Sequence, residues 1–175
     1  MAELWDVLDE NGNKIGRLHE RGKPMKAGEG HLVVQIWIMN SKREFLISKR
    51  SLGVGWWDGM WHTTGGCAIA GDDSLSATLR ETKEELGVAI NPKNGKLFKQ
   101  YSEPRISDDG FVALHVWIFR QEVDIESVTF QPDEICDVMW ADKEQIRKMI
   151  DEGIFIPPEE AYPYIDELFD FCETI

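Results

Sequence analysis

Three glutamates lie within five residues of one another near the middle of the chain. They are Glu81, Glu84 and Glu85, and Arg80 stands directly before them. Carboxylates at such spacing repel one another and weaken an isolated helix. Convergent carboxylates are also how proteins hold Mg²⁺ or Mn²⁺, because these hard cations prefer oxygen ligands. The pattern therefore allows two interpretations, a solvated acidic helix face or a site for a divalent metal.

A helix is predicted around these glutamates. Asp72 or Asp73 is a suitable N-cap, and Gly87 is a suitable end. At about 100° per residue, four residues form one narrow stripe that faces the core. They are Leu75, Leu79, Thr82 and Leu86. The charged residues lie on the opposite side of the helix, so the predicted core face and the acidic face are separate.

The rest of the chain alternates predicted strands with turns. A hairpin is expected at about residues 3–20, around the turn residues Asn11 and Gly12. Further strands are expected at 31–40, 44–50, 96–103, 110–120 and 135–141, and helices at 142–153 and about 162–173. This order predicts one α/β (α+β) domain over residues 1–175, with a mixed, largely antiparallel sheet.

The composition narrows the classes of partner. The chain has 175 residues and a formal net charge of −13, which disfavours binding to nucleic acid or to an acidic membrane surface. A small polyanion remains compatible if a divalent cation lies between it and the protein. No apolar run is long enough to cross a bilayer, and the acidic N-terminus shows no secretory signal. Three separated cysteines, Cys67, Cys136 and Cys172, suggest a reducing cytoplasm.

The acidic helix also carries a longer motif. Gly66, Asp72, Arg80-Glu81-Thr82, Glu84-Glu85 and Gly87-Val88 resemble the Nudix box of the Nudix hydrolases, Gx5Ex7REUxEExGU, where U is a bulky aliphatic residue. Seven of the nine specified positions are kept. Asp72 stands where the box has glutamate, and Thr82 stands where it has an aliphatic residue. The resemblance covers roughly residues 3 to 145.

The resemblance implies a fold, a reaction and a set of site residues. The fold would be the α/β/α sandwich of the family, and the reaction would be hydrolysis of a nucleoside diphosphate linked to another group X, with Mg²⁺ or Mn²⁺ as cofactor. Arg80 would orient Glu81, which is also a candidate base. Glu134 resembles a further catalytic carboxylate, although a surface charge on a loop explains it equally well. The implied metal site comprises Gly66, Glu81, Glu84 and Glu85.

One branch of this family contains type I isopentenyl-diphosphate isomerase, and the N-terminal half of the chain resembles that branch most. The isomerase cysteine, counted from Trp61, would fall on Gly66, whereas Cys67 comes one residue later and would face the other way on a strand. The isomerase histidine two residues further is replaced by Ala68. Hydrolysis is therefore favoured over isomerisation. A non-catalytic nucleotide-binding module is the third alternative.

Four further residues are candidates for contact with a small diphosphate substrate, namely His31, Lys49, Arg50 and Trp61. Each also has an ordinary explanation. A single histidine is commonly structural, two basic residues at a strand end are commonly solvated, and tryptophan commonly buries apolar area. A homodimer is left open by the sequence.

Overall fold

The computed structural model describes residues 2–53 and 55–175, and within them it shows a mixed sheet of nine strands. The strands are β1 (Leu4–Leu8), β2 (Lys14–Glu20), β3 (Gly30–Met39), β4 (Phe45–Arg50), β5 (Trp61–His62), β6 (Thr64–Cys67), β7 (Gly95–Pro104), β8 (Phe111–Arg120) and β9 (Ile135–Ala141). The α-helices are α1 (Ser74–Leu86), α2 (Lys143–Asp151), α3 (Pro158–Ala161) and α4 (Ile165–Glu173). Short 3-10 turns span Pro92–Asn94 and Ile125–Ser127.

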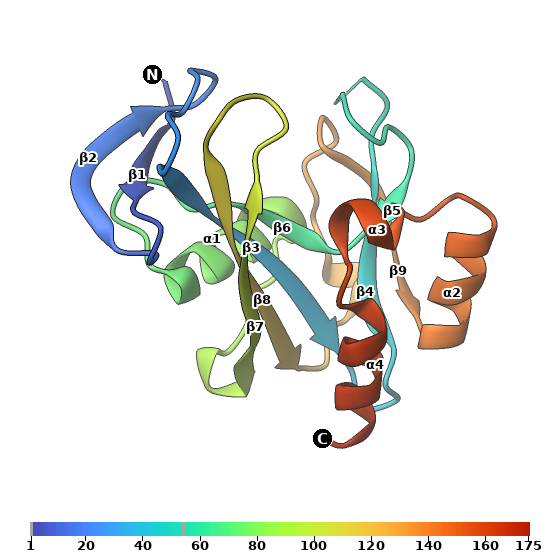
Figure 1. Cartoon of the computed structure of the whole chain (residues 1–175). Coiled ribbons are helices and arrows are strands. Elements are labelled where there is room, and N and C mark those ends of the chain that lie inside the picture. Colours follow the sequence, from blue (N-terminus) through green and yellow to red (C-terminus); the bar gives the residue numbers. More distant parts are fainter. Residues whose placement is uncertain (1, 54) are drawn as a thin grey trace.

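Strand β3 is the centre of the sheet (Figure 1). It pairs in parallel with β8 from Gly30↔Phe111 to Met39↔Arg120, and antiparallel with β1, β4 and β6. Strand β7 extends the sheet beyond β8, and β4 pairs with both β5 and β9. All pairs other than β3–β8 are antiparallel in the described part of the chain. The predicted mixed, largely antiparallel sheet is thus confirmed.

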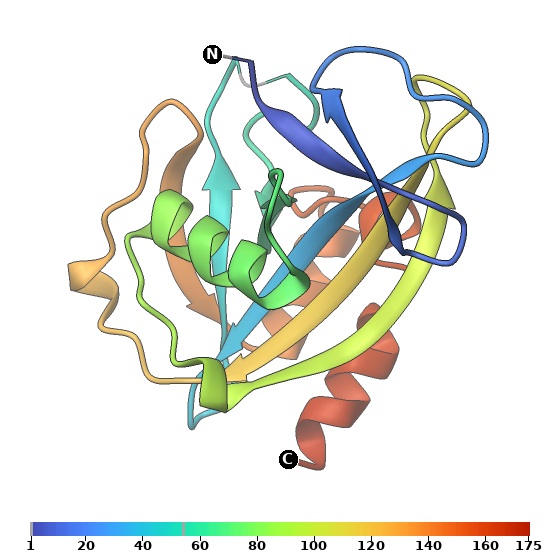
Figure 2. The same ribbon diagram turned by 90° about the vertical axis from the view of Figure 1, so that its left-hand side faces the viewer.

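Two apolar cores lie on opposite faces of the sheet. On one face, α1 packs on a cluster that includes Val34, Ile36 and Phe119. On the other face, α2 and α4 cover a cluster centred on Trp37 and Phe169. Figure 2 shows α1 in front of the strands and α4 behind them. This is the expected α/β/α arrangement, and burial of these two faces is the main source of stability.

Helix α1 begins and ends as its sequence predicts. The side chain of Asp73 accepts a hydrogen bond from the backbone N–H of Ser76 (2.7 Å), and Gly87 closes the helix with a φ of +66°. The predicted core stripe is only partly correct, since Leu75 and Leu79 are half-buried. The fully buried residues are Ala77, Thr78, Thr82 and Leu86. Small residues face the core because α1 lies close against β3 and β6.

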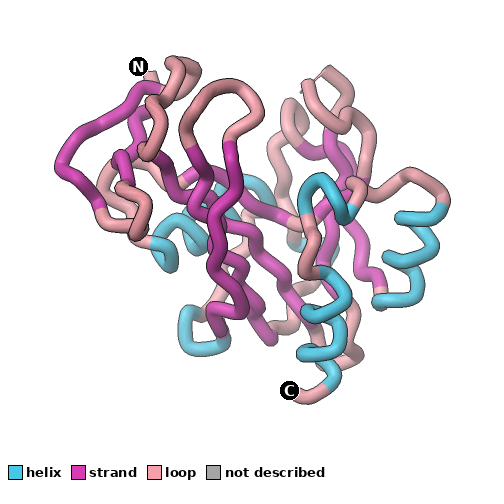
Figure 3. The backbone as a smooth tube through the Cα atoms, in the orientation of Figure 1, coloured by secondary structure: helices cyan, strands magenta, loops and turns pink. Residues whose placement is uncertain are grey.

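The N-terminal hairpin, β1 and β2, lies beside the N-terminal end of β3, where Leu8 pairs with Gly30 (Figure 3). Its register contains an irregularity between Asp6 and Leu8, so Leu4 pairs with Glu20. At the other end of the chain, α4 begins at Ile165, and the short helix α3 precedes it. A turn separates these two helices, and its residues Tyr162 and Tyr164 are buried in the core. No helix in the described residues is long and apolar enough to span a bilayer.

Candidate active site

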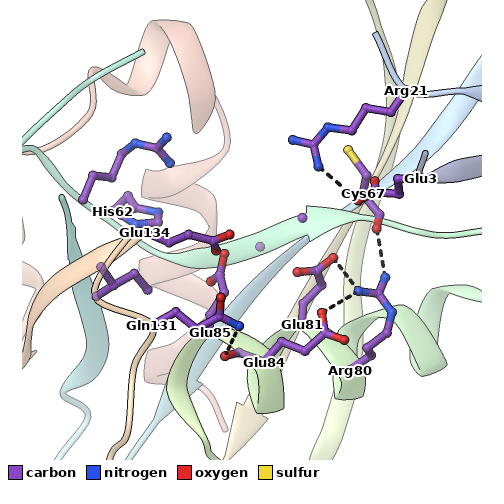
Figure 4. Close-up of a pocket in the computed structure, with 14 residues that line it drawn as sticks. Glu3, Arg21, His62, Cys67, Arg80, Glu81, Glu84, Glu85, Gln131 and Glu134 are labelled. Carbon is purple, nitrogen blue, oxygen red and sulfur yellow. Dashed lines mark hydrogen bonds and ion pairs between the residues drawn. The ribbon is translucent and has the colours of Figure 1, made fainter. Parts of the chain in front are cut away.

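A cavity of about 440 Å³ opens where α1, β6, the end of β4, the loop before β9 and the N-terminal hairpin meet (Figure 4). This volume is within the usual range for a small-molecule site. Its walls are markedly acidic. The lining residues are Glu3, Arg21, Arg50, His62, Gly65, Gly66, Cys67, Arg80, Glu81, Glu84, Glu85, Gln131, Glu134 and Ile135.

Arg80 is held by several acceptors at once. Its Nε and a terminal nitrogen donate to Asp72 Oδ2 (3.0 and 2.9 Å), and the same terminal nitrogen donates to the carbonyl of Cys67 (2.9 Å). The other terminal nitrogen donates to Glu81 Oε1 (2.9 Å) and Glu84 Oε2 (3.0 Å). A guanidinium with this many charged partners has a fixed orientation. Asp72 therefore reaches the arginine despite its shorter side chain.

Glu81 lies directly over Gly66. A Cβ atom at position 66 would overlap the carboxylate of Glu81, so the glycine provides the space that this carboxylate occupies. The side chain of Glu81 is 13% exposed. Burial raises the pKa of Glu81 and the charge of Arg80 opposes that rise. The result is a carboxylate that is positioned by its neighbours and remains open to the cavity.

Glu85 is the least compensated group of the cavity. Its Oε2 atom is buried and has no hydrogen-bond partner among the described residues. Burial raises the pKa of Glu85 well above its ordinary value, and repulsion from Glu81 and Glu134 adds to this. The backbone N–H of Gly65 and the charge of Arg50 oppose this rise only in part. A buried carboxylate oxygen without a partner is unfavourable unless a cation compensates it.

A divalent cation fits this donor set. In residues 2–53 and 55–175, no three acidic, histidine or cysteine side chains converge closely enough to hold a metal as they stand. The reason is that Glu81 and Glu84 turn toward Arg80 (Figure 4). The buried Oε2 of Glu85 nevertheless has no partner among the described residues, and burial together with repulsion between the carboxylates raises the pKa values of Glu81 and Glu85. A bound cation would relieve both effects. Oxygen ligands of this kind are those that Mg²⁺ and Mn²⁺ prefer.

Comparison with known proteins identifies the family. The chain matches the NUDIX domain over residues 30–159, which is most of its length. The chain belongs to the Nudix family. It is 34% identical to an uncharacterized Nudix hydrolase of Listeria innocua over 169 residues, covering 96% of this chain and 94% of the relative. It is 26% identical to the isopentenyl-diphosphate Δ-isomerase of Citrobacter koseri over 80% of this chain and 77% of that enzyme.

A solved structure shares the fold of this chain. A crystal structure of a Deinococcus radiodurans protein aligns with a TM-score of 0.68 at 22% identity, covering 97% of this chain and 99% of that one. This Nudix chain is therefore a pyrophosphohydrolase of a family that acts on small diphosphates and generally needs divalent metal ions. Its relatives also confirm the resemblance to the isomerase branch of the family.

The Nudix box residues named from the sequence lie together, and two candidates outside the box join them. Glu134 lines the cavity from the loop before β9, where its carbonyl accepts a hydrogen bond from the backbone of Ser51 (2.9 Å). Arg50 lines the same side, and its buried Nε has no partner within the described chain. The two residues are brought together because β4 pairs with β9.

The other three candidates lie outside the cavity wall that the structure describes. Lys49 lies over the ring of Trp61 (5.9 Å), and Trp61 is buried in the core on the α4 side. Lys49 and Arg50 diverge because consecutive strand residues face opposite ways. His31 stacks on Trp5 at a ring-centroid distance of 4.0 Å and contacts Arg105 through Nδ1 (3.1 Å). These surroundings fit a structural histidine.

Gly66 faces Glu81, and the side chain of the next residue, Cys67, points to the opposite face of β6, as the alternation of side chains along a strand predicts. Its Sγ lies 3.7 Å from His31 Nε2 and still borders the cavity. Burial raises the pKa of the Cys67 thiol to about 11. The group is therefore a neutral thiol, which is a weak nucleophile.

Four of the lining residues with polar or charged side chains were not predicted from the sequence, namely Glu3, Arg21, His62 and Gln131. They come from separate segments, and no short motif connects them. Gln131 donates to the carbonyl of Glu84 (3.2 Å) and so ties the loop before β9 to α1. His62 is buried beside Ser48 (3.3 Å), and burial, with the charge of Arg50, lowers its pKa to about 4. It is a neutral part of the cavity wall.

Proposed function

We propose that this Nudix chain hydrolyses the diphosphate linkage of a nucleoside diphosphate joined to a group X, with Mg²⁺ or Mn²⁺ as its cofactor. The observation that carries the proposal is the buried, unpartnered Oε2 of Glu85 beside two further box glutamates in a cavity of suitable size. Three neighbouring carboxylates repel one another when no cation is bound. A divalent cation between them removes this repulsion and can also contact phosphate oxygens.

The residues that would hold the metal are Glu81, Glu84 and Glu85, with Gly66 beside them. When bound, the metal supplies neutralisation of diphosphate charge and a lowered pKa for water. Release of Glu84 from Arg80 suits this role, because Glu84 is exposed and its bond to Arg80 is a surface interaction. Glu81 and Glu85 are already directed toward the cavity (Figure 4).

Side chains of the protein orient the metal ligands, accept the proton from water and bind phosphate. Arg80, anchored on Asp72, fixes the orientation of Glu81. Glu81 has a raised pKa and faces the cavity, which suits acceptance of a proton from the attacking water. Glu134 is the second candidate for that role because it borders the same space from the opposite wall. The Nε of Arg50 has no partner among the described residues and is a candidate donor to a phosphate oxygen.

The proposal is tested by phosphate release from a panel of compounds in the presence of Mg²⁺. The panel includes ADP-ribose, nucleotide sugars, dinucleoside polyphosphates and nucleoside triphosphates, with coupling enzymes that convert each product to free phosphate. We expect Glu85→Gln to lower turnover by roughly 100-fold or more, since a metal ligand is lost. Glu144→Gln, at an exposed position of α2, is the matched control. Normal turnover by Glu85→Gln would show that the metal site is placed wrongly.

A second candidate, isomerisation of isopentenyl diphosphate, is favoured by two observations. The Cys67 thiol borders the cavity and contacts His31, and named isomerases are among the relatives. We expect Cys67→Ala to retain hydrolysis, and we expect NMR to detect no conversion of isopentenyl diphosphate by the unmodified protein. Conversion that is lost in Cys67→Ala would instead identify an isomerase.

A further inference from the structure

The N-terminal hairpin supplies one wall of the cavity. Glu3 and Arg21, at the two open ends of β1 and β2, both line it. This segment lies outside residues 30–159, the part that matches the NUDIX domain. The hairpin therefore adds chemistry to the site that the box residues do not supply.

The cavity contains three arginines, and their free hydrogen-bonding capacity differs. The donors of Arg80 are occupied by Asp72, Glu81, Glu84 and the carbonyl of Cys67. The guanidinium of Arg21 makes one hydrogen bond, to Glu3 Oε2 (3.2 Å), among the residues that are described. A guanidinium has five N–H donors. Arg21 therefore keeps most of its donors for a further anion, whereas those of Arg80 are occupied unless Glu84 is released.

Glu3 holds the guanidinium of Arg21 at the cavity wall through a hydrogen bond. One carboxylate oxygen of Glu3 binds Arg21, and the other accepts a hydrogen bond from Trp5 Nε1 (2.7 Å). The backbone N–H of Arg21 also donates to the carbonyl of Glu3 (2.9 Å). Trp5 is buried and stacked on His31, so this pair rests on a rigid part of the hairpin. Glu3 is thus a positioning residue.

Arg21 lies on the far side of the carboxylates from Arg50. Figure 4 shows Arg21 beside Cys67, across the cavity from His62 and Glu134. Arg50 belongs to the latter side, since it follows Lys49, which pairs with Trp61, and precedes Ser51, which is bonded to Glu134. A diphosphate centred on the box glutamates would therefore leave Arg21 facing another part of the substrate.

We propose that Arg21 binds a second anionic group of the substrate, a phosphate or a carboxylate outside the scissile diphosphate. The inference rests on the proposed function for the position of the diphosphate. It predicts a preference for substrates that carry this extra charge, because a charge-assisted hydrogen bond to guanidinium forms only with them. The N-terminal hairpin is then the element that selects the substrate class.

The test uses two matched pairs of compounds that differ in one anion. NADPH and NADH differ in a phosphate, and UDP-glucuronate and UDP-glucose differ in a carboxylate. For at least one pair we expect kcat/KM to be about tenfold higher for the more anionic member. We expect Arg21→Ala to abolish this preference and Arg21→Lys to retain part of it. Glu3→Gln should reduce it through KM.

Arg17→Ala is the matched control, because Arg17 lies on β2, the strand that leads to Arg21, is outside the cavity lining, and pairs with Glu29. It should keep the full preference. An equal rate loss for both members of each pair in Arg21→Ala, or no preference in the unmodified protein, would overturn the inference.

Equilibrium binding of the same compounds by calorimetry, with Ca²⁺ in place of Mg²⁺, separates the two proposals. A binding preference that depends on Arg21 without any hydrolysis would support the role of Arg21 and contradict the proposed reaction. Hydrolysis with no preference for the more anionic compound would support the proposed reaction and contradict the role of Arg21. Absence of both binding and hydrolysis for all four compounds would overturn the inference about Arg21.

Discussion

Asp72 stands one methylene short of the glutamate that the Nudix box carries at this position. From the sequence alone, the reach of this shorter side chain could not be judged, because it depends on where the loop before α1 lies. The structure places Asp72 Oδ2 within 3.0 Å of two nitrogens of Arg80. The same arginine holds Glu81, so the effect of Asp72 on the site passes through Arg80.

Substitution of Asp72 should therefore affect turnover more than substrate binding. We expect Asp72→Ala to lower kcat about tenfold, with KM changed less, because Arg80 loses two charge-assisted hydrogen bonds and no longer fixes Glu81. Asp72→Glu should retain most of the activity, since its carboxylate can reach the same nitrogens. Steady-state kinetics of both variants measure this. A fall in thermal stability with unchanged kcat would indicate a structural role alone.

The elements of the site differ in how far the sequence predicts them. Helix α1 and its acidic face follow from caps and periodicity, which are local properties. The contact of Glu3 with Arg21 depends on the hairpin register, and the irregularity between Asp6 and Leu8 shifts that register. Glu134 reaches the cavity through the pairing of β4 with β9. Such long-range pairings leave no local pattern in the sequence.

The close approach of β6 to α1 gives a prediction for Gly66. A Cβ atom there would overlap the Glu81 carboxylate, so Gly66→Ala should displace this side chain from the cavity. We expect a loss of activity of roughly 100-fold, because misplacement by about 1 Å is enough to disrupt catalysis. Circular dichroism should remain unchanged. Activity close to that of the unmodified protein would show that Glu81 does not need its observed position.

On the scale of the whole molecule, one sheet brings distant segments to a single cavity. The parallel pairing of β3 with β8 joins the two halves of the chain, and the hairpin closes one side. Composition and element order predict the α/β/α class, but they do not specify which strands become neighbours, because many pairings bury the same apolar residues. This packing also buries a titratable group, His31, and its burial makes the free energy of unfolding depend on pH.

Burial of His31 predicts that the folded protein becomes less stable as the pH falls. Burial, assisted by the charge of Arg105, lowers the pKa of His31 from an ordinary value of 6.5 to about 4. Arg105 donates to Nδ1, so the neutral ring carries its proton on Nε2, toward Cys67. The unfolded chain takes up a proton as the pH falls below 6.5, whereas the folded protein does so only near pH 4. The stabilising contribution is therefore complete above pH 6.5 and is lost as the pH falls toward 4.

We expect this titration to remove up to about 3 kcal/mol from the free energy of unfolding. Urea unfolding between pH 7.5 and 4.5 measures it, with His31→Asn as the variant that cannot titrate. Other groups contribute equally to both proteins, so the stability difference between them isolates His31. The advantage of the unmodified protein over His31→Asn should shrink by roughly 1.4 kcal/mol for each pH unit below 6.5. A difference that stays constant with pH would mean that His31 titrates alike in the folded and unfolded chains.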